Sequence, residues 1–287
     1  IVFGLVGSEM CIRDRNRRVN FWKENVKKIL FYGAGNISQA LIMGLLSSGF
    51  NKNNIEYIDR NLSNQKNLKK LKIKKAEQKN ISKIDVFVLA VKPKDALEAY
   101  NEIIELQDKP KIISLVAGIQ TKKYLKSNNI ATLMRAMPNT SSRFCQGITA
   151  LFNKSFSDRD FKFVKKLFSQ VGFVIELDKE QKMNQFTGLI GSGPAYFFYI
   201  LKVYEKELLK MCNGDMKIVK QMMTSLIQGV AMSINNNSNL DELIKMVASK
   251  KGTTEAGLEY FKSNKLDTIF KKGLQSAVNR SKEISNE

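Results

Sequence analysis

The stretch Lys28-Ile-Leu-Phe-Tyr-Gly33-Ala-Gly35-Asn36-Ile-Ser-Gln-Ala40 constrains the fold more than any other part of the chain. A short apolar run of β-forming residues ends in two glycines one residue apart, and a run with helical spacing follows at once. Gly33 suits a tight turn out of a strand, and Gly35 lets a bound group come close to the backbone. The N-terminus of the following helix offers N–H groups to an anion, most often a dinucleotide pyrophosphate. Ser38 stands where the third glycine of the full fingerprint falls, so an ordinary strand–turn–helix remains the alternative.

Strands and helices alternate after this stretch. The predicted strands are 54–59, 73–76, 85–91, 111–116, 132–136, 148–152 and 173–177, and the predicted helices are 62–71, 95–106, 121–126 and 158–169. This series predicts an α/β fold with a Rossmann-like doubly wound sheet, in which ligands lie at the carboxyl ends of the strands. Those ends carry Gly33–Asn36, Asp59-Arg60, Ala90–Pro93, Ala117-Gly118 and Met137–Thr140.

The end of the second predicted strand bears on the cofactor. An acid there would accept a hydrogen bond from the ribose 2′-hydroxyl of NAD, whereas an arginine would favour the 2′-phosphate of NADP. Asp59 and Arg60 are both present. Both NADPH and NADH therefore stay open at this point.

The second half of the chain is helical. Gly191-Ser-Gly-Pro194 opens a long helix, Asn213-Gly214 ends it, and another helix with an apolar face starts near Met216. So many apolar faces within residues 179–287 suggest burial against a partner subunit. We expect a dinucleotide-binding domain at 27–178, an all-α dimerisation and substrate domain at 179–287, and a leader at 1–26 that is non-native or disordered. Within that leader, Gly7–Arg15 resembles a translated sequencing adapter.

Composition removes several classes of function. The chain has no histidine, which excludes Ser-His nucleophilic triads and His-ligated metals, and we expect no metal site. Its three cysteines show no disulfide or metal-ligand spacing, and no apolar run approaches the ~18 residues of a membrane span. We therefore expect a cytoplasmic enzyme. The net charge of +20 raises the possibility of a nucleic-acid binder, but the lysines are spread along the chain without interleaved aromatics, so specific nucleic-acid binding is not expected.

A second candidate site precedes a helix near the C-terminus. In Ser249-Lys-Lys-Gly252-Thr-Thr254-Glu-Ala-Gly257-Leu, Gly252 can act as the N-cap and leave the following N–H groups free beside two hydroxyls. This arrangement suits a carboxylate. A plain capped helix, with Glu255 complementing the helix dipole, is the alternative.

These blocks together, in this order, resemble the pyrroline-5-carboxylate reductase family. The matching blocks are Gly33–Ala40, Ala90–Pro93, Arg135–Thr140, Gly191–Tyr196 and Gly252–Leu258. The resemblance implies hydride transfer from NAD(P)H to the C=N carbon of 1-pyrroline-5-carboxylate, which gives L-proline in the last step of proline biosynthesis. It also implies a homodimer with interleaved helical domains, often assembled further into a decamer.

The resemblance also implies a set of site residues. Substrate would be held by Ser249, Gly252, Thr253 and Thr254, with Thr254 as the catalytic residue nearest the imine. Cofactor contacts would come from Gly33, Ala34, Gly35, Asn36, Ile37, Ser38, Asp59, Arg60, Asn80, Ala90, Val91, Lys92, Pro93 and Asn139.

Four positions depart from the family pattern. Lys250 and Lys251 replace a proline and a glycine, Asn184 stands where an acid is common, and Ser141 replaces a proline. A lysine at position 251 is strained if the backbone there needs a positive φ; alternatively, two cations could strengthen carboxylate binding. Two other functions therefore stay open: a catalytically silent NADP-binding dimer, and a related imine, hydroxyacid or F420-dependent reductase.

Overall fold

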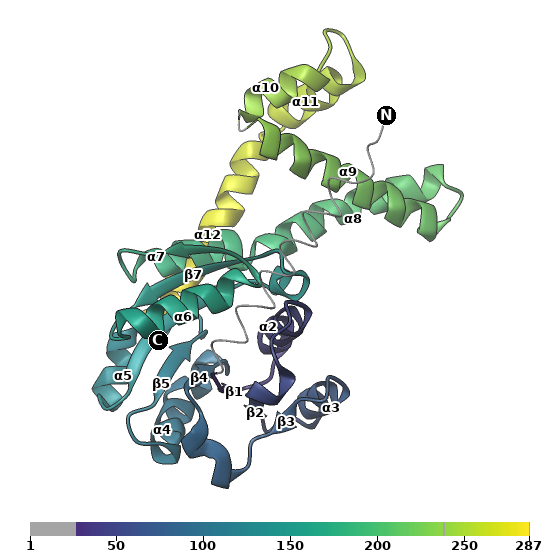
Figure 1. The fold of residues 1–287 in the computed structure, drawn as a ribbon. Helices are drawn as coiled ribbons and strands as arrows, with labels where there is room; N and C mark the ends of the chain where they lie inside the picture. The colour runs from purple at the N-terminus through teal and green to yellow at the C-terminus, as the bar shows by residue number, and fades with distance from the viewer. Residues whose placement is uncertain (1–26, 238, 287) are drawn as a thin grey trace. The chain divides into compact units, whose positions relative to one another are not determined.

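The computed structural model describes residues 27–237 and 239–286 (Figure 1). The leader predicted at 1–26 lies outside these residues. The chain forms two compact units: the first ends at Ser192 and takes in the chain again from Ala277, and the second is Gly193–Ser276. The domain boundary predicted after residue 178 stays a prediction.

A single eight-stranded sheet organises the first unit, with strand order β3-β2-β1-β4-β5-β6-β7-β8. The order reverses between β1 and β4, which opens a crevice at the carboxyl ends of these strands. The predicted strands agree closely with the observed ones: β1 Ile29–Tyr32, β2 Ile55–Ile58, β3 Lys74–Lys75, β4 Val86–Leu89, β5 Lys111–Ser114, β6 Thr132–Pro138, β7 Gly147–Asn153 and β8 Gly172–Glu176.

Helices cover both faces of this sheet because successive strand residues point to opposite sides. In β1, Ile29 and Phe31 belong to one apolar cluster, and Leu30 and Tyr32 to another. The first cluster receives α2 (Asn36–Ser47), α3 (Leu62–Lys70) and α6 (Asp158–Ser169). The second receives α4 (Ala96–Leu106) and α5 (Thr121–Ser127). The predicted doubly wound α/β architecture is confirmed.

One edge of the sheet departs from the parallel pattern. β7 runs antiparallel to β6, with Met134 opposite Asn153, whereas the other pairs are parallel. Only a short 3-10 helix, η4 (Thr140–Phe144), joins the two strands, so no crossover helix returns the chain to a parallel start. β6 also continues to Pro138, past the point where β5 stops pairing with it at Arg135, and there proline's missing N–H removes no bond to β5.

Several short segments were not predicted. They are the 3-10 helices η1 (Lys52–Asn54), η2 (Gln78–Lys83) and η3 (Pro93–Asp95), the helix α7 (Lys182–Phe186) and a single π-helical turn, η5 (Thr187–Gly191). The long helix expected at Gly191–Pro194 is observed as α8 (Gly193–Met211). Pro194 is its second residue, where a missing N–H costs nothing.

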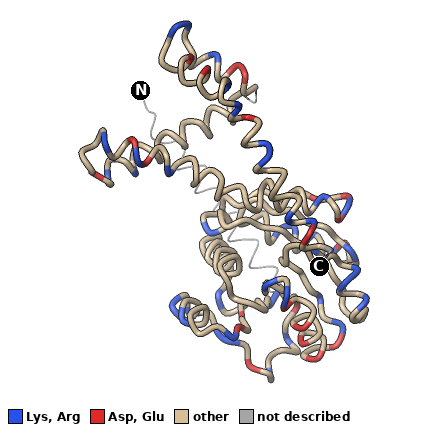
Figure 2. Tube along the Cα trace, turned by 180° about the vertical axis from the view of Figure 1, so that it is seen from behind, with Lys and Arg blue, Asp and Glu red and all other residues tan. Residues whose placement is uncertain are grey.

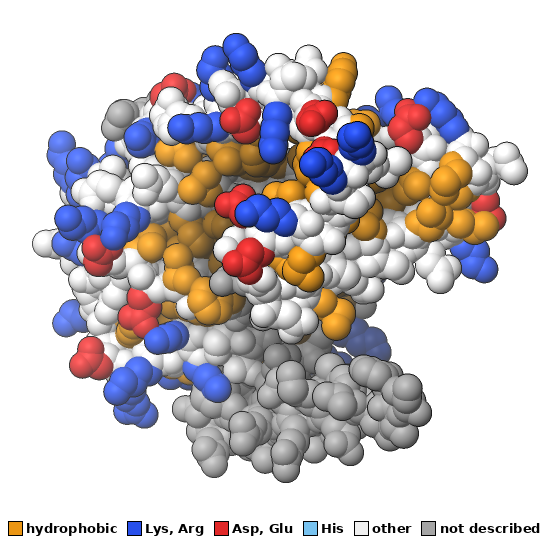
Figure 3. All heavy atoms as spheres, turned by 90° about the horizontal axis from the view of Figure 1, so that it is seen from above, with side chains coloured by type: hydrophobic (Ala, Val, Ile, Leu, Met, Phe, Trp, Pro, Cys, Tyr) orange, Lys and Arg blue, Asp and Glu red, His pale blue; other side chains and the backbone are white. Residues whose placement is uncertain are grey.

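The second unit is helical and exposes a large apolar surface. It contains α8, α9 (Met216–Asn236), α10 (Leu240–Val247), α11 (Thr253–Ser263) and the first part of α12 (Leu266–Asn286). Phe198 is 67% exposed and Met246 is 77% exposed, and they are two of many such side chains on these helices. Figure 3 shows apolar side chains gathered at the surface of the face seen there. Patches of this extent mark an interaction surface.

Charge and hydropathy add two observations. Figure 2 shows Lys and Arg spread along the described chain, with Asp and Glu among them, rather than in one stripe. None of the helices in the described ranges has the length and apolar content that a membrane span requires.

Candidate active site

The turn after β1 requires glycine at its first position. Gly33 has φ +95°, and a Cβ built there would lie 2.5 Å from the carbonyl oxygen of Ala90, at the end of β4. Among the described residues, apart from its own stretch of backbone, no heavy atom lies within 4 Å of where a Cβ on Gly35 would stand. Gly33 therefore lets the turn pass beside β4, and Gly35 borders open space.

Two side chains from the start of α2 hold this turn by bonding its carbonyl groups. Ser38 donates from Oγ to the Gly33 carbonyl at 2.6 Å, and Gln39 donates from Nε2 to the Ala34 carbonyl at 2.7 Å. No side chain caps α2 at Gly35. The fingerprint's third glycine is thus replaced by a buried serine that ties down the turn. The uncapped helix N-terminus beside open space fits the pyrophosphate of a dinucleotide.

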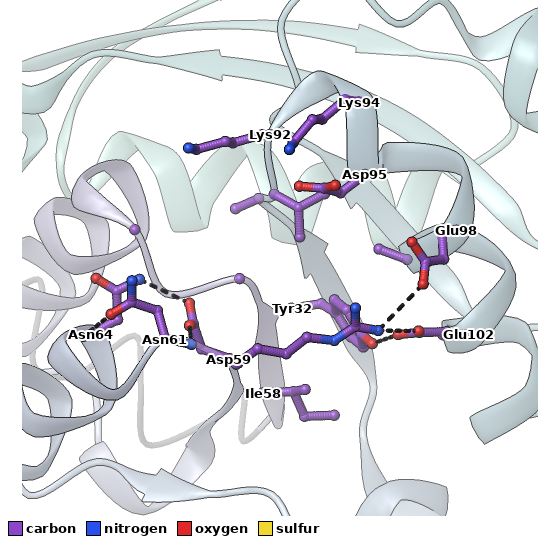
Figure 4. A pocket seen from close by; sticks show the side chains of 16 residues that line it. Tyr32, Ile58, Asp59, Asn61, Asn64, Lys92, Lys94, Asp95, Glu98 and Glu102 are labelled. Atoms are coloured by element: carbon purple, nitrogen blue, oxygen red, sulfur yellow. Dashed lines mark hydrogen bonds and ion pairs between the residues drawn. The ribbon is translucent and has the colours of Figure 1, made fainter.

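A cavity of about 350 Å³ lies against this turn (Figure 4). It is bounded by the ends of β1, β2 and β4 and by the start of α4, as expected at the point where the strand order reverses. The lining residues are Tyr32, Gly33, Gly35, Ile58, Asp59, Arg60, Asn61, Asn64, Ala90, Val91, Lys92, Lys94, Asp95, Glu98, Ala99 and Glu102.

Asp59 organises the rim of the cavity. Its carboxylate accepts hydrogen bonds from the Ala34 N–H at 2.6 Å, the Asn61 N–H at 2.5 Å and Asn64 Nδ2 at 3.1 Å. The carboxylate therefore links the end of β2 to the glycine turn. The sequence predicted a contact with a ribose hydroxyl, which stays a prediction, but it did not predict this internal role.

Arg60 extends along α4. Its Nη2 lies 2.5 Å from Oε1 of Glu102 and 3.5 Å from Oε1 of Glu98, and Tyr32 donates from its hydroxyl to Oε2 of Glu102. Dashed lines in Figure 4 mark these contacts. Both acids were missed in the sequence. They stand four residues apart on the helix after Lys92-Pro93, a spacing that places them on one face toward the strand ends.

The predicted cofactor residues fall into two groups. Those that line the cavity are Gly33, Gly35, Asp59, Arg60, Ala90, Val91 and Lys92. Ala34, Asn36, Ile37, Ser38 and Pro93 are neighbours of these in the chain. Asn80 lies on η2, outside the lining set, and the buried Asn139 accepts a hydrogen bond from the Ile148 N–H at 3.1 Å. For both asparagines, the contact with a cofactor stays a prediction.

A buried ionic network lies under the β5 and β6 ends of the sheet. Arg135 Nη1 is 3.1 Å from Glu180, which also accepts hydrogen bonds from the N–H and hydroxyl of Thr121. Burial raises the pKa of the neighbouring Tyr124 to about 12, so this hydroxyl stays protonated at neutral pH. At Asn184, where the family commonly has an acid, Oδ1 accepts hydrogen bonds from Ser281 and Ser285.

The second candidate site is a turn between α10 and α11. Gly252 caps α11 without a side-chain hydrogen bond, and a Cβ there would lie 2.4 Å from Ser249 Oγ. Thr253 and Thr254 are the first two residues of the helix, so their N–H groups lack helical partners. Lys251 has φ +58°, and its N–H donates to Glu255 at 2.5 Å. The backbone strain expected for a lysine at this position is therefore present.

Family models match the two regions of the chain in which these turns lie. The family model for pyrroline-5-carboxylate reductase dimerisation matches residues 180–284, and that for coenzyme F420-dependent NADP oxidoreductase matches 28–118. A match to the dimerisation family supports self-association of this chain.

Whole-length relatives carry the same family name. A Haemophilus influenzae protein named pyrroline-5-carboxylate reductase is 31% identical over 266 residues, covering 90% of this chain and 97% of the relative. One from Bacillus subtilis, named pyrroline-5-carboxylate reductase 1, is 31% identical and covers 91% of this chain and 90% of the relative. The solved structure of a pyrroline-5-carboxylate reductase from Coxiella burnetii has 29% identity and a TM-score of 0.77, covering 91% of this chain and 99% of that one. This chain belongs to the pyrroline-5-carboxylate reductase family.

Proposed function

We propose that this chain reduces 1-pyrroline-5-carboxylate to L-proline with NAD(P)H. One observation carries the proposal: a relative named for this activity is 31% identical to this chain and is matched over 97% of its length. The cavity beside Gly33 and Gly35 adds physical support, because it offers an uncapped helix N-terminus to a dinucleotide pyrophosphate.

The cofactor would bind along the cavity rim. The N–H groups at the start of α2 (Asn36, Ile37, Ser38) would hold the pyrophosphate, and Asp59 and Arg60 would lie near the ribose at the end of β2. Bound NAD(P)H supplies the hydride for the C=N carbon. The solved structure of a Plasmodium falciparum pyrroline carboxylate reductase with NADP bound shares this fold, with a TM-score of 0.79 and 22% identity over 90% of this chain and 98% of that one.

The turn before α11 would hold the substrate. Its first N–H groups and the hydroxyls of Ser249, Thr253 and Thr254 can surround a carboxylate and a ring nitrogen. A protonated imine is already electrophilic, so the protein's main task is to position it, which can contribute roughly 7–11 kcal/mol. Thr254 would hydrogen-bond the ring nitrogen and hold it in place. No histidine is required for this chemistry.

We also propose that the functional unit is a homodimer formed by the second unit. The exposed apolar helices there account for such an assembly. Assembly beyond the dimer into a decamer is the extension that the family resemblance implies. The cytoplasmic location expected from the cysteine usage stays a prediction, as does the lack of specific nucleic-acid binding.

One alternative has a specific observation behind it. Lys251 occupies a left-handed conformation in which an L residue other than glycine is strained. If this strain displaces the turn that holds the substrate, the chain would bind dinucleotide without reducing the imine. That behaviour would define a catalytically silent NADP-binding dimer.

The test is oxidation of NADPH, and separately of NADH, followed at 340 nm with and without DL-pyrroline-5-carboxylate. We expect oxidation only with the imine present, and a loss of about tenfold or more in kcat/KM for Thr254→Ala. Thr254→Ser, which keeps the hydroxyl, is the matched control and should retain activity. Cofactor binding without imine-dependent oxidation would favour the silent dimer, and equal activity of both variants would remove Thr254 from the mechanism.

A further inference from the structure

The end of the cavity at β2 has an unusual balance of charge. Arg60 is the cation at the position where a 2′-phosphate would be recognised, but two carboxylates from α4 contact its guanidinium. Asp59 and Asp95 line the same cavity, so its four acids outnumber the cations Arg60, Lys92 and Lys94. A doubly charged phosphate brought to Arg60 would enter beside carboxylates that already compete for the same donors.

The two carboxylates differ in how firmly they are held. Glu98 lies 3.5 Å from Arg60, and its side chain is 63% exposed. Glu102 lies 2.5 Å from Arg60, is 31% exposed and accepts a second hydrogen bond from the hydroxyl of Tyr32 on β1. Because Tyr32 is buried in the sheet, its hydroxyl holds the Glu102 carboxylate in one position. The Arg60 side chain, in contrast, is mostly exposed. Glu102 is therefore the anchored partner and Arg60 the adaptable one.

A ribose that carries a free 2′-hydroxyl makes a different demand. A neutral hydroxyl can donate to a carboxylate and does not require the guanidinium. A 2′-phosphate accepts hydrogen bonds and repels nearby carboxylates, so it must draw Arg60 away from Glu102. The same ion pair thus opposes NADPH and leaves NADH unaffected.

We propose that Glu102 is a specificity-determining residue of this cofactor site: anchored by Tyr32, it retains Arg60 and lowers the affinity for NADPH relative to NADH. The inference rests on the dinucleotide site of the proposed function. It assigns Glu102 a positioning role that acts through Arg60.

The experiment measures binding of NADPH and of NADH to the full chain by nicotinamide fluorescence, without the imine. For Glu102→Gln we expect the Kd for NADPH to fall about twofold to fivefold, the upper part of the range set by the strength of an exposed ion pair, and the Kd for NADH to change less than twofold. Glu105→Gln is the matched control, because Glu105 is exposed on the same helix outside the cavity and the charge change is identical. This control should leave both constants unchanged.

A double variant tests whether Glu102 acts on the NADPH affinity through Arg60. In an Arg60→Ala background, Glu102→Gln should change the Kd for NADPH less than twofold. The proposal is overturned if Glu102→Gln weakens NADPH binding, or if it changes the Kd values for NADPH and NADH by the same factor. It is also overturned if Glu102→Gln lowers the Kd for NADPH as much in the Arg60→Ala background as in the unmodified chain. Because binding is measured without turnover, a chain that binds dinucleotide but does not reduce the imine contradicts only the proposed reaction. A chain that binds neither dinucleotide contradicts both.

Discussion

At the scale of single residues, the chain has another residue at two positions where a glycine is expected, one in the family pattern and one in the dinucleotide-binding fingerprint. Lys251 takes φ +58° at the position where the family has glycine, and its N–H is held by Glu255. Ser38 replaces the third glycine of the fingerprint and bonds the carbonyl of Gly33. Lys251 therefore strains the turn before α11, whereas Ser38 stabilises the turn after β1.

Lys251→Gly should therefore stabilise the protein. Relief of the left-handed strain, about 1–2 kcal/mol, exceeds the backbone entropy of a new glycine, about 0.5–1 kcal/mol, so we expect a gain of about 0.5 kcal/mol. Lys250→Gly is the matched control, because its φ is not positive and only the entropy term applies. The midpoint of urea unfolding, followed by circular dichroism, should rise for Lys251→Gly and fall for Lys250→Gly. A loss of stability in both variants would refute the claim that Lys251 is strained.

The glycine turn allows a second comparison. Gly35→Ala adds a methyl that meets no other part of the described chain within 4 Å, so the free energy of unfolding should stay within about 0.5 kcal/mol. The methyl would stand over the N-terminus of α2, and NADPH binding should weaken about tenfold or more. Gly33→Ala should instead destabilise the fold, since its methyl meets the Ala90 carbonyl. Unchanged NADPH affinity in Gly35→Ala would place the pyrophosphate elsewhere.

Residue types at strand ends were predictable, but their partners were not. The sequence placed Asp59 and Arg60 beside the cavity because both follow an apolar strand. It could not show that Asp59 bonds the Ala34 N–H, or that Arg60 meets Glu98 and Glu102, because these contacts depend on how separate elements pack. Asn80 and Asn139 were assigned by family resemblance alone, and neither lines the cavity.

At the scale of elements, hydrophobic period and turn chemistry predicted most of the sheet and its helices. The buried strand Val86–Leu89 and the two-faced alternation of β1 are direct consequences of apolar patterning. The 3-10 segments and the π-helical turn at Thr187–Gly191 were missed because such short segments carry no repeating pattern. The antiparallel β7 was also missed, since pairing direction depends on the length of the connection rather than on the strand's own residues.

Ion pairs attach helix α6 to residues at or just before the start of two strands. Asp160, in the first turn of α6, lies 2.7 Å from the amino groups of Lys27, two residues before β1, and of Lys111, the first residue of β5. Burial opposes the ionised carboxyl, but hydrogen bonds from Lys111, Lys27 and Ser157 outweigh it and hold the pKa of Asp160 well below its ordinary value.

This depressed pKa makes stability depend on pH. The ionised Asp160 carboxylate adds to the free energy of unfolding at pH values above the unfolded-state pKa, about 3.9. This stabilisation is lost as the pH falls through the lower folded-state pKa. Asp160→Asn should therefore cost about 2 kcal/mol of unfolding free energy at pH 7, and the difference from the unmodified chain should shrink below about pH 4. Asp158→Asn, exposed in the same turn, should have little effect. A difference that does not depend on pH would show that the charge is not responsible.

At the scale of the whole molecule, the second unit exposes apolar surface that a partner copy would cover. Phe198 is 67% exposed on α8 and lines a groove between α8 and α9. We expect sedimentation velocity to show at least a dimer for the unmodified chain. Phe198→Glu should weaken the association between the copies, so that a larger fraction sediments as monomer. Leu62→Glu is the control: Leu62 is 79% exposed, but it lies on α3 in the first unit. A monomer in the unmodified chain, or equal effects of both variants, would contradict dimerisation through these helices.

The central claim is that this chain moves a hydride to the carbon of a cyclic C=N bond. The most direct measurement supplies NADPH deuterated at the transferable nicotinamide position, together with pyrroline-5-carboxylate, and analyses the proline formed by mass spectrometry and NMR. The account predicts one deuterium per proline, carried on the former imine carbon next to the ring nitrogen. Unlabelled proline, or bound NADPH with no proline formed, would contradict it.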